Sequence, residues 1–89
     1  MNKFKEIEKL RKQIDKVDSE LIKVLAKRFK ITSRVRLLKI ENNLPIEDKG
    51  RELKIMDKVE KIAKKSKLNP EPVKEILKLI IKEVKGSLT

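Results

Sequence analysis

The stretch KFKEIEKLRKQIDKVDSELIKVLAKRFKITSRVRLLKIEN, residues 3–42, decides the fold of this chain. It contains neither proline nor glycine, and its apolar residues recur at alternating spacings of three and four, the periodicity of one face of an α-helix. The pattern therefore predicts a single helix over about residues 3–42, roughly 60 Å long at 1.5 Å per residue. The apolar positions, called the apolar seam below, are Ile7, Leu10, Ile14, Val17, Leu21, Val24, Ile31, Val35 and Leu38.

Three cations lie on the packing side of this predicted helix. Arg28 stands where the seam should continue, and Arg11 and Lys39 follow a neighbouring stripe with the same spacing. A cation on a packing surface costs several kcal/mol unless an anion meets it, so these residues predict an anion pocket. Arg28 and Lys39 share a face, whereas Arg11 lies about 25 Å from Arg28 and would reach the same ligand from a second, antiparallel chain. The alternative is that Arg28 pairs with a core carboxylate such as Asp18 or Glu52.

Two shorter helices are predicted after the long one. Asn42, Asn43 and Pro45 interrupt the periodicity, which predicts a loop over residues 43–48. Asp48 suits the N-cap of a second helix over about residues 49–65, and Asn69 suits the N-cap of a third over about residues 70–87. The two apolar faces run through Ile55, Met56, Val59, Ile62 and Ala63, and through Val73, Ile76, Leu77, Ile80, Ile81 and Val84.

The helix lengths predict an assembly of two chains. The two short helices, laid end to end, match the length of the long one, so a single chain would be a thin rod with little buried surface. Only two aromatic residues, Phe4 and Phe29, are present to enlarge a core. We therefore expect an all-α fold in which a single domain, residues 1–89, joins a second copy in an intertwined homodimeric helical bundle.

Composition excludes several kinds of site. The chain has no cysteine and no histidine, which removes disulfides, thiolate chemistry and the usual zinc sites. No apolar run approaches the roughly 20 residues that span a bilayer, and no signal-peptide pattern opens the chain, so we expect a cytoplasmic protein without a membrane partner.

The net charge of +11 has two interpretations. Lysine supplies most of it, a bias typical of heat-adapted proteins whose surfaces carry many solvated ion pairs. The charge also suits an anionic partner. The scarcity of aromatic stacking residues argues against specific nucleic-acid binding, although not against weak nonspecific binding.

The cations, the acidic residues and the proline-containing loop stand in one register that resembles the all-helical (AroQ-type) chorismate mutases. The match covers nearly the whole chain, and the family fold, three helices per chain with two chains intertwined, agrees with the lengths above. The resemblance implies an isomerase that rearranges chorismate to prephenate in phenylalanine and tyrosine biosynthesis, with no metal and no cofactor. The matching positions are residues 10–15, Asp18, residues 25–28, Lys39, residues 45–46, Asp48 and residues 51–52.

The resemblance implies roles for the three cations. Arg28 would bind a carboxylate of the dianionic substrate through a two-pronged hydrogen bond. Arg11 of the partner subunit would bind a carboxylate from the far side. Lys39 would bridge a carboxylate and the ether oxygen whose bond breaks, which makes Arg28 and Lys39 the expected catalytic residues.

The resemblance also implies roles for residues at the other end of the substrate. Glu52 and the backbone of Asp48 would hold the ring hydroxyl, and Arg51 would line the same end. Val35 and Ile81 match apolar positions that pack against the substrate.

Two positions depart from the family pattern. The family usually has glutamine or glutamate where this chain has Leu88, and often a small polar residue where it has Val84. Loss of one hydrogen-bond donor to the reacting oxygen commonly costs about 10² to 10³ in rate. Two explanations therefore stay open: the enzyme is slow, or it depends on a partner enzyme of the shikimate pathway.

The sequence is also compatible with two other functions. One is an isochorismate pyruvate lyase, which resembles the mutases in fold and in its cationic site. The other is a non-catalytic, basic helical binding module, either a regulatory partner of a shikimate-pathway enzyme or a nonspecific nucleic-acid binder.

Overall fold

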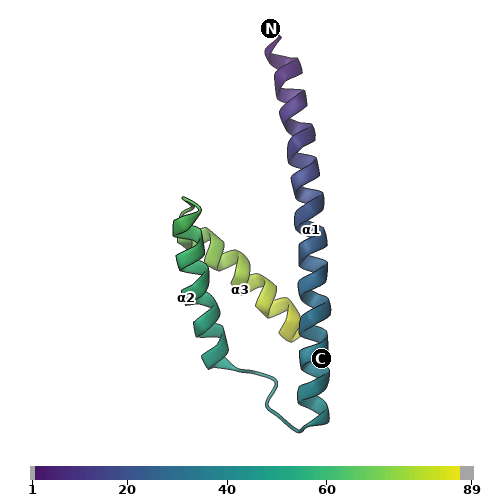
Figure 1. Cartoon of the computed structure of the whole chain (residues 1–89), viewed down its shortest axis with the longest axis vertical. Coiled ribbons are helices and arrows are strands. Elements are labelled where there is room, and N and C mark those ends of the chain that lie inside the picture. Colours follow the sequence, from purple (N-terminus) through teal and green to yellow (C-terminus); the bar gives the residue numbers. More distant parts are fainter. Residues whose placement is uncertain (1, 87–89) are drawn as a thin grey trace. The chain divides into compact units, whose positions relative to one another are not determined.

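The computed structural model describes residues 2–86, and these residues form three α-helices and no strand (Figure 1). Helix α1 spans Lys3–Glu41, α2 spans Lys49–Lys65 and α3 spans Pro70–Gly86. The prediction of an all-α fold with one long helix and two shorter ones is confirmed. Residue 87, the expected end of the third helix, lies outside the described residues. No helix within residues 2–86 is long and apolar enough to cross a membrane.

An asparagine in the left-handed conformation follows the end of helix α1. Asn43 has a φ of 55°, and its N–H donates to the Ile40 carbonyl at 3.2 Å. The next N–H, that of Leu44, donates to the Lys39 carbonyl at 2.8 Å. These two bonds form a Schellman motif, which satisfies carbonyls that the last turn of a helix leaves unpaired. The helix therefore stops at Glu41, one residue before the predicted end.

The two shorter helices begin at the caps that the sequence predicts. The Asp48 carboxylate accepts a hydrogen bond from the Arg51 N–H at 3.0 Å, and Asp48 itself has an extended backbone. The Asn69 side chain accepts one from the Glu71 N–H at 3.2 Å, with Pro70 at the first helical position. Each cap satisfies an N–H that the first turn cannot pair within the helix, and Pro70 has no N–H to satisfy.

Helix α2 ends in a second Schellman motif, built on a lysine. Lys67 has a φ of 60°, and its N–H donates to the Lys64 carbonyl at 3.1 Å. The Leu68 N–H donates to the Ala63 carbonyl at 2.8 Å. Lysine carries a Cβ that disfavours the left-handed region, so this turn holds a strained residue at its tip.

The chain divides into two units, residues 1–34 and residues 35–89, and the boundary falls within α1. The first unit contains a single helix, and none of the α1 residues is buried. Its seven seam residues are between 44% and 64% exposed. A lone helix has nothing within its own unit against which to pack an apolar face, so the seam of residues 7–31 lies uncovered.

The second unit is built on a hairpin of α2 and α3, which pack side by side (Figure 1). Ala63 is the one fully buried residue of the described chain, at 2% exposure. Ile62 and Ile76, both expected on the packing faces, are more than half exposed. The half-buried apolar residues of the hairpin are Ile55, Met56, Val59, Val73, Leu77, Ile80, Ile81 and Val84.

An ion pair joins the two helices of the hairpin. The Lys74 ammonium lies 3.1 Å from a Glu60 carboxylate oxygen, and both side chains are partly buried. Glu71, one turn before Lys74 on α3, lies 3.7 Å from the same ammonium. The hydrogen bond to Glu60 is the main reason that the pKa of Lys74 is raised above its usual 10.5. The pair therefore ties α3 to α2 while Lys74 is charged.

Candidate anion-binding site

The predicted site residues fall in both units of the chain. Arg11 and Arg28 lie on α1 within residues 1–34, and Leu88 lies outside the described residues. The remaining predicted residues belong to the second unit and are Val35, Lys39, Asp48, Arg51, Glu52, Ile81 and Val84.

The two arginines of the first unit differ in their surroundings. The Arg11 guanidinium lies 3.2 Å from a Glu8 carboxylate oxygen, one turn away on the same helix, and both side chains are largely exposed. An exposed pair of this kind is worth little and leaves the arginine available to a ligand. Arg28 is half-buried and forms no ion pair with Asp18 or with any other acidic residue among residues 2–34. Within that unit, the alternative of an Arg28–Asp18 pair is not found.

Lys39 is held at the loop that precedes α2. Its ammonium donates a hydrogen bond of 3.3 Å to the carbonyl of Ile46, seven residues later, and the side chain is half-buried. The loop continues from Ile46 to Asp48, the N-cap of α2. This bond therefore directs the Lys39 side chain toward the segment that carries Asp48, Arg51 and Glu52.

The Asp48 side chain caps α2, whereas the Asp48 backbone carbonyl can accept a further hydrogen bond. The carboxylate accepts the Arg51 N–H, and the Asp48 carbonyl accepts the Glu52 N–H at 3.1 Å. A carbonyl oxygen has a second lone pair, so it can still accept a hydrogen bond from a ligand hydroxyl. The contact between the Asp48 backbone and a ligand stays a prediction.

A cavity of about 510 Å³ lies between α2 and α3. It brings together two predicted site residues, Glu52 of α2 and Ile81 of α3, and its volume suits a small organic ligand. The walls combine apolar side chains with three lysines against one glutamate, which suits an anion with an apolar body. The lining residues are Lys49, Glu52, Leu53, Met56, Lys78, Ile81 and Lys82.

The three lysines of this cavity are absent from the sequence-based site. On α3, Lys78 and Lys82 stand three residues before and one residue after Ile81, and on α2 Lys49 stands three residues before Glu52. The three-residue spacing from Glu52 and Ile81 could have identified Lys49 and Lys78, because such neighbours share a helix face, whereas the position of Lys82 next to Ile81 gives no such signal. Because lysine is abundant along the whole chain, the residue type alone does not distinguish these three positions.

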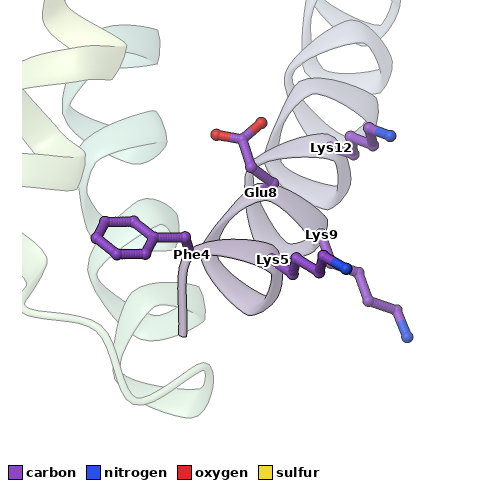
Figure 2. A pocket seen from close by; sticks show the side chains of 5 residues that line it. All are labelled: Phe4, Lys5, Glu8, Lys9 and Lys12. Atoms are coloured by element: carbon purple, nitrogen blue, oxygen red, sulfur yellow. The ribbon is translucent and has the colours of Figure 1, made fainter. Parts of the chain in front are cut away.

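A second hollow, of about 360 Å³, lies on α1 near its start. All five of its lining residues belong to one helix, and Figure 2 shows Phe4 pointing to one side while Lys5 and Lys9 point to the other. Side chains of one helix that diverge in this way do not enclose a ligand. The hollow is therefore a surface feature between Phe4, Lys5, Glu8, Lys9 and Lys12.

Within residues 2–86, no group of three or more histidine, cysteine, aspartate or glutamate side chains is placed to hold a metal ion. The arrangement that the second unit does provide is a hydrogen-bond acceptor, Glu52, and ammonium groups around an apolar wall. Such a site can orient an anion and stabilise negative charge.

Comparison with known proteins agrees with this chemistry. Residues 10–87 match the sequence profile of the family described as chorismate mutase type II. A chorismate mutase of Methanocaldococcus jannaschii is 27% identical over 83 residues, which cover 93% of this chain and 84% of that protein. The resemblance inferred from the sequence is confirmed.

Bifunctional chorismate mutase/prephenate dehydratases are also similar. The protein of Buchnera aphidicola subsp. Schizaphis graminum is 36% identical over 73 residues, which cover 82% of this chain and 19% of that protein. The protein of Aquifex aeolicus is 36% identical over 61 residues, which cover 68% of this chain and 17% of that protein. The chain thus matches about a fifth of the length of these bifunctional relatives.

Proposed function

Because the chain belongs to the type II chorismate mutase family, we propose that it catalyses the rearrangement of chorismate to prephenate. The observation that carries the proposal is the α2–α3 cavity, in which Glu52 and Ile81 lie together among lysines. Chorismate is a dianion with a ring hydroxyl, and these groups supply a hydrogen-bond acceptor, an apolar wall and positive charge.

The substrate carboxylates are bound by cations of α1 in this proposal. Arg28 binds one carboxylate with a two-pronged hydrogen bond, a geometry that the planar guanidinium favours. Arg11 of the partner subunit binds a carboxylate from the opposite side. In the part of the chain that the structure describes, Arg11 forms an exposed ion pair with Glu8, which a substrate carboxylate can replace at little cost.

Lys39 stabilises the charge that develops during the reaction. The rearrangement breaks a carbon–oxygen bond, and negative charge grows on the ether oxygen. The ammonium of Lys39, now bonded to the Ile46 carbonyl at 3.3 Å, donates to this oxygen instead when substrate is bound. A preorganised donor at such an oxygen is worth about 10² to 10³ in rate.

The ring hydroxyl is held at the start of α2. The Glu52 carboxylate and the Asp48 carbonyl accept hydrogen bonds from it, while Arg51 lines the same end. Val35 and Ile81 pack against the apolar faces of the ring. These contacts hold the substrate in its compact, reactive conformation, which converts binding energy into rate without a nucleophile or an obligatory proton transfer.

The working form of the enzyme in this proposal is a homodimer. The seam residues of α1 in the first unit are all between 44% and 64% exposed, and they form a row at helical spacing that Arg28 alone interrupts. Large apolar patches on a soluble chain mark interfaces, and two such seams cover each other when two α1 helices pack. The same packing brings Arg11 of the partner subunit to the site.

The test is conversion of chorismate by the purified protein at elevated temperature. Loss of chorismate absorbance is followed, and the product is identified as prephenate by its acid conversion to phenylpyruvate. The proposal expects prephenate to form well above the uncatalysed rate and expects an Arg28→Ala variant to lose most of that activity. A folded dimer that gives no acceleration contradicts the proposal and favours a partner-dependent or non-catalytic role.

A further inference from the structure

The α2–α3 cavity contains positive charge that the proposed roles do not use. Lys49, Lys78 and Lys82 all line it, yet none of them belongs to the predicted site. Three ammonium groups around one hollow repel each other, and helical neighbours of like charge such as Lys78 and Lys82 destabilise a helix. An anion bound in the cavity relieves this repulsion.

The three lysines differ in the carboxylates available to them. Lys78 forms an ion pair of 3.2 Å with Glu75, three residues earlier on α3. Lys49 stands three residues before Glu52, so an acidic side chain shares its helix face.

Lys82 has no such neighbour. The positions three and four residues away on α3 are Leu79, Lys78, Lys85 and Gly86, and none is acidic. Among residues 2–86, no hydrogen bond or ion pair engages the Lys82 side chain. Lys82 is therefore the cavity lysine that has neither an ion pair among residues 2–86 nor an acidic residue one helical turn away.

Lys82 also lies next to a residue that the proposed function places against the substrate. Ile81 precedes it directly, and both line the same cavity. The lysine stem is long and flexible, and its ammonium can hydrogen-bond in several directions, so it can follow a carboxylate at the rim of the apolar wall. From α3, it approaches a ligand from a different helix than Arg28 or Lys39.

We propose that Lys82 is a further substrate-binding residue, which binds a carboxylate of the dianionic substrate from α3. This inference rests on the proposed function, because it assigns the cavity to the same substrate. It gives α3 a cation in a part of the chain where the family pattern has a polar side chain and this chain has Val84.

The test compares Lys82→Ala, Lys82→Arg and Lys58→Ala. Lys58 is an exposed lysine of α2 that does not line the cavity, so its removal changes the net charge equally. Loss of one charge-assisted hydrogen bond corresponds to roughly a 10- to 100-fold rise in KM for chorismate. We expect this rise in Lys82→Ala, with kcat changed only a few-fold, partial recovery in Lys82→Arg, and a KM close to wild type in Lys58→Ala.

Binding of prephenate, measured by titration calorimetry, gives a second readout that needs no turnover. The Kd for this dianion should weaken in Lys82→Ala by a factor similar to that of KM. An active wild type whose KM and Kd change no more in Lys82→Ala than in Lys58→Ala overturns the inference and leaves the proposed function intact. A wild type that does not convert chorismate contradicts the proposed function, and the prephenate titration then decides whether Lys82 binds the anion.

Discussion

The two units of this chain cover their apolar residues to different extents. In residues 35–89, α2 and α3 cover each other, bury Ala63 and carry the Lys74–Glu60 ion pair between them. In residues 1–34 there is one helix, and its apolar seam is exposed along its whole length. Both helical regions have the same regular periodicity in sequence. The difference shows that periodicity predicts a packing face, whereas the partner of that face must come from elsewhere in the fold.

For the first unit, we propose that this partner is a second copy of the chain. An isolated helix in water gains little from its own backbone bonds, and most helical stability in proteins comes from packing an apolar face. The hairpin obtains this stability within one chain, whereas in the proposed dimer α1 obtains it on association. Stability and activity should therefore depend on association through α1 and, to a smaller extent, on details of the hairpin.

The largest effect is expected from a charge placed in the seam. Leu21→Asp puts a carboxylate where two seams pack, and burying an unpaired charge costs several kcal/mol. The dimer should dissociate and lose most of its helical signal, as measured by sedimentation and circular dichroism. Ser19→Asp places the same residue two positions earlier, off the seam, and should stay dimeric. Equal behaviour of the two variants would show that the seam is not an interface.

Loss of Arg28 should abolish most activity without loss of the fold. Arg28→Ala removes the two-pronged contact to a substrate carboxylate, and we expect kcat/KM to fall by about 10² or more. Arg34→Ala, an exposed arginine on the same helix, is the control and should change kcat/KM only a few-fold. Unfolding of Arg28→Ala with retention of activity in the folded fraction would make Arg28 a structural residue.

Replacement of Lys67, which follows α2, by glycine should stabilise the fold. Lys67 sits at a φ of 60°, where glycine meets no steric penalty. Lys67→Gly should raise the free energy of unfolding by about 0.5 to 1 kcal/mol in chemical denaturation. Asn43→Gly, at the corresponding position after α1, should gain less because asparagine tolerates this region better. A loss of stability in Lys67→Gly would mean that the lysine side chain makes a contact that outweighs its strain.

The smallest effect concerns pH. Because Glu60 raises the pKa of Lys74 above 10.5 in the folded chain, the pair contributes its full stability below 10.5 and loses it as pH rises through the folded pKa. The stability difference between wild type and Lys74→Met should therefore shrink in thermal melts as the pH rises above about 10.5. Use of the difference cancels the titration of the other lysines. A difference that stays constant as the pH rises would show that the ion pair does not stabilise the fold.

Local signals in the sequence predict most of the secondary structure. The absence of proline and glycine over residues 3–42 predicts α1, and both Asp48 and Asn69 act as the expected N-caps. These features depend on neighbouring residues alone, which is why they can be predicted. The left-handed Lys67 is harder, since lysine is rarely found there and no glycine marks the turn.

Features that depend on tertiary packing are predicted less well. Ile62 and Ile76 fit the helical periodicity but are exposed, because the hairpin covers only part of each apolar face. The cavity joins Glu52 with Ile81, two residues to which the resemblance gives roles, but the sequence does not single out the lysines that line it. Composition alone does not distinguish one lysine from another. The packing of α2 on α3 places Lys82, but not Lys58, in the lining of the cavity.

We propose that each active site uses residues of two chains, and a subunit-mixing experiment tests this arrangement. Arg11→Ala and Arg28→Ala are each expected to be inactive, and their heterodimer contains one site with both arginines intact. In a twofold dimer with random exchange, about half of the molecules are heterodimers, so activity should return to about a quarter of the wild-type value. No recovery, in a mixture where subunit exchange is demonstrated, would contradict the claim and place each site within one chain.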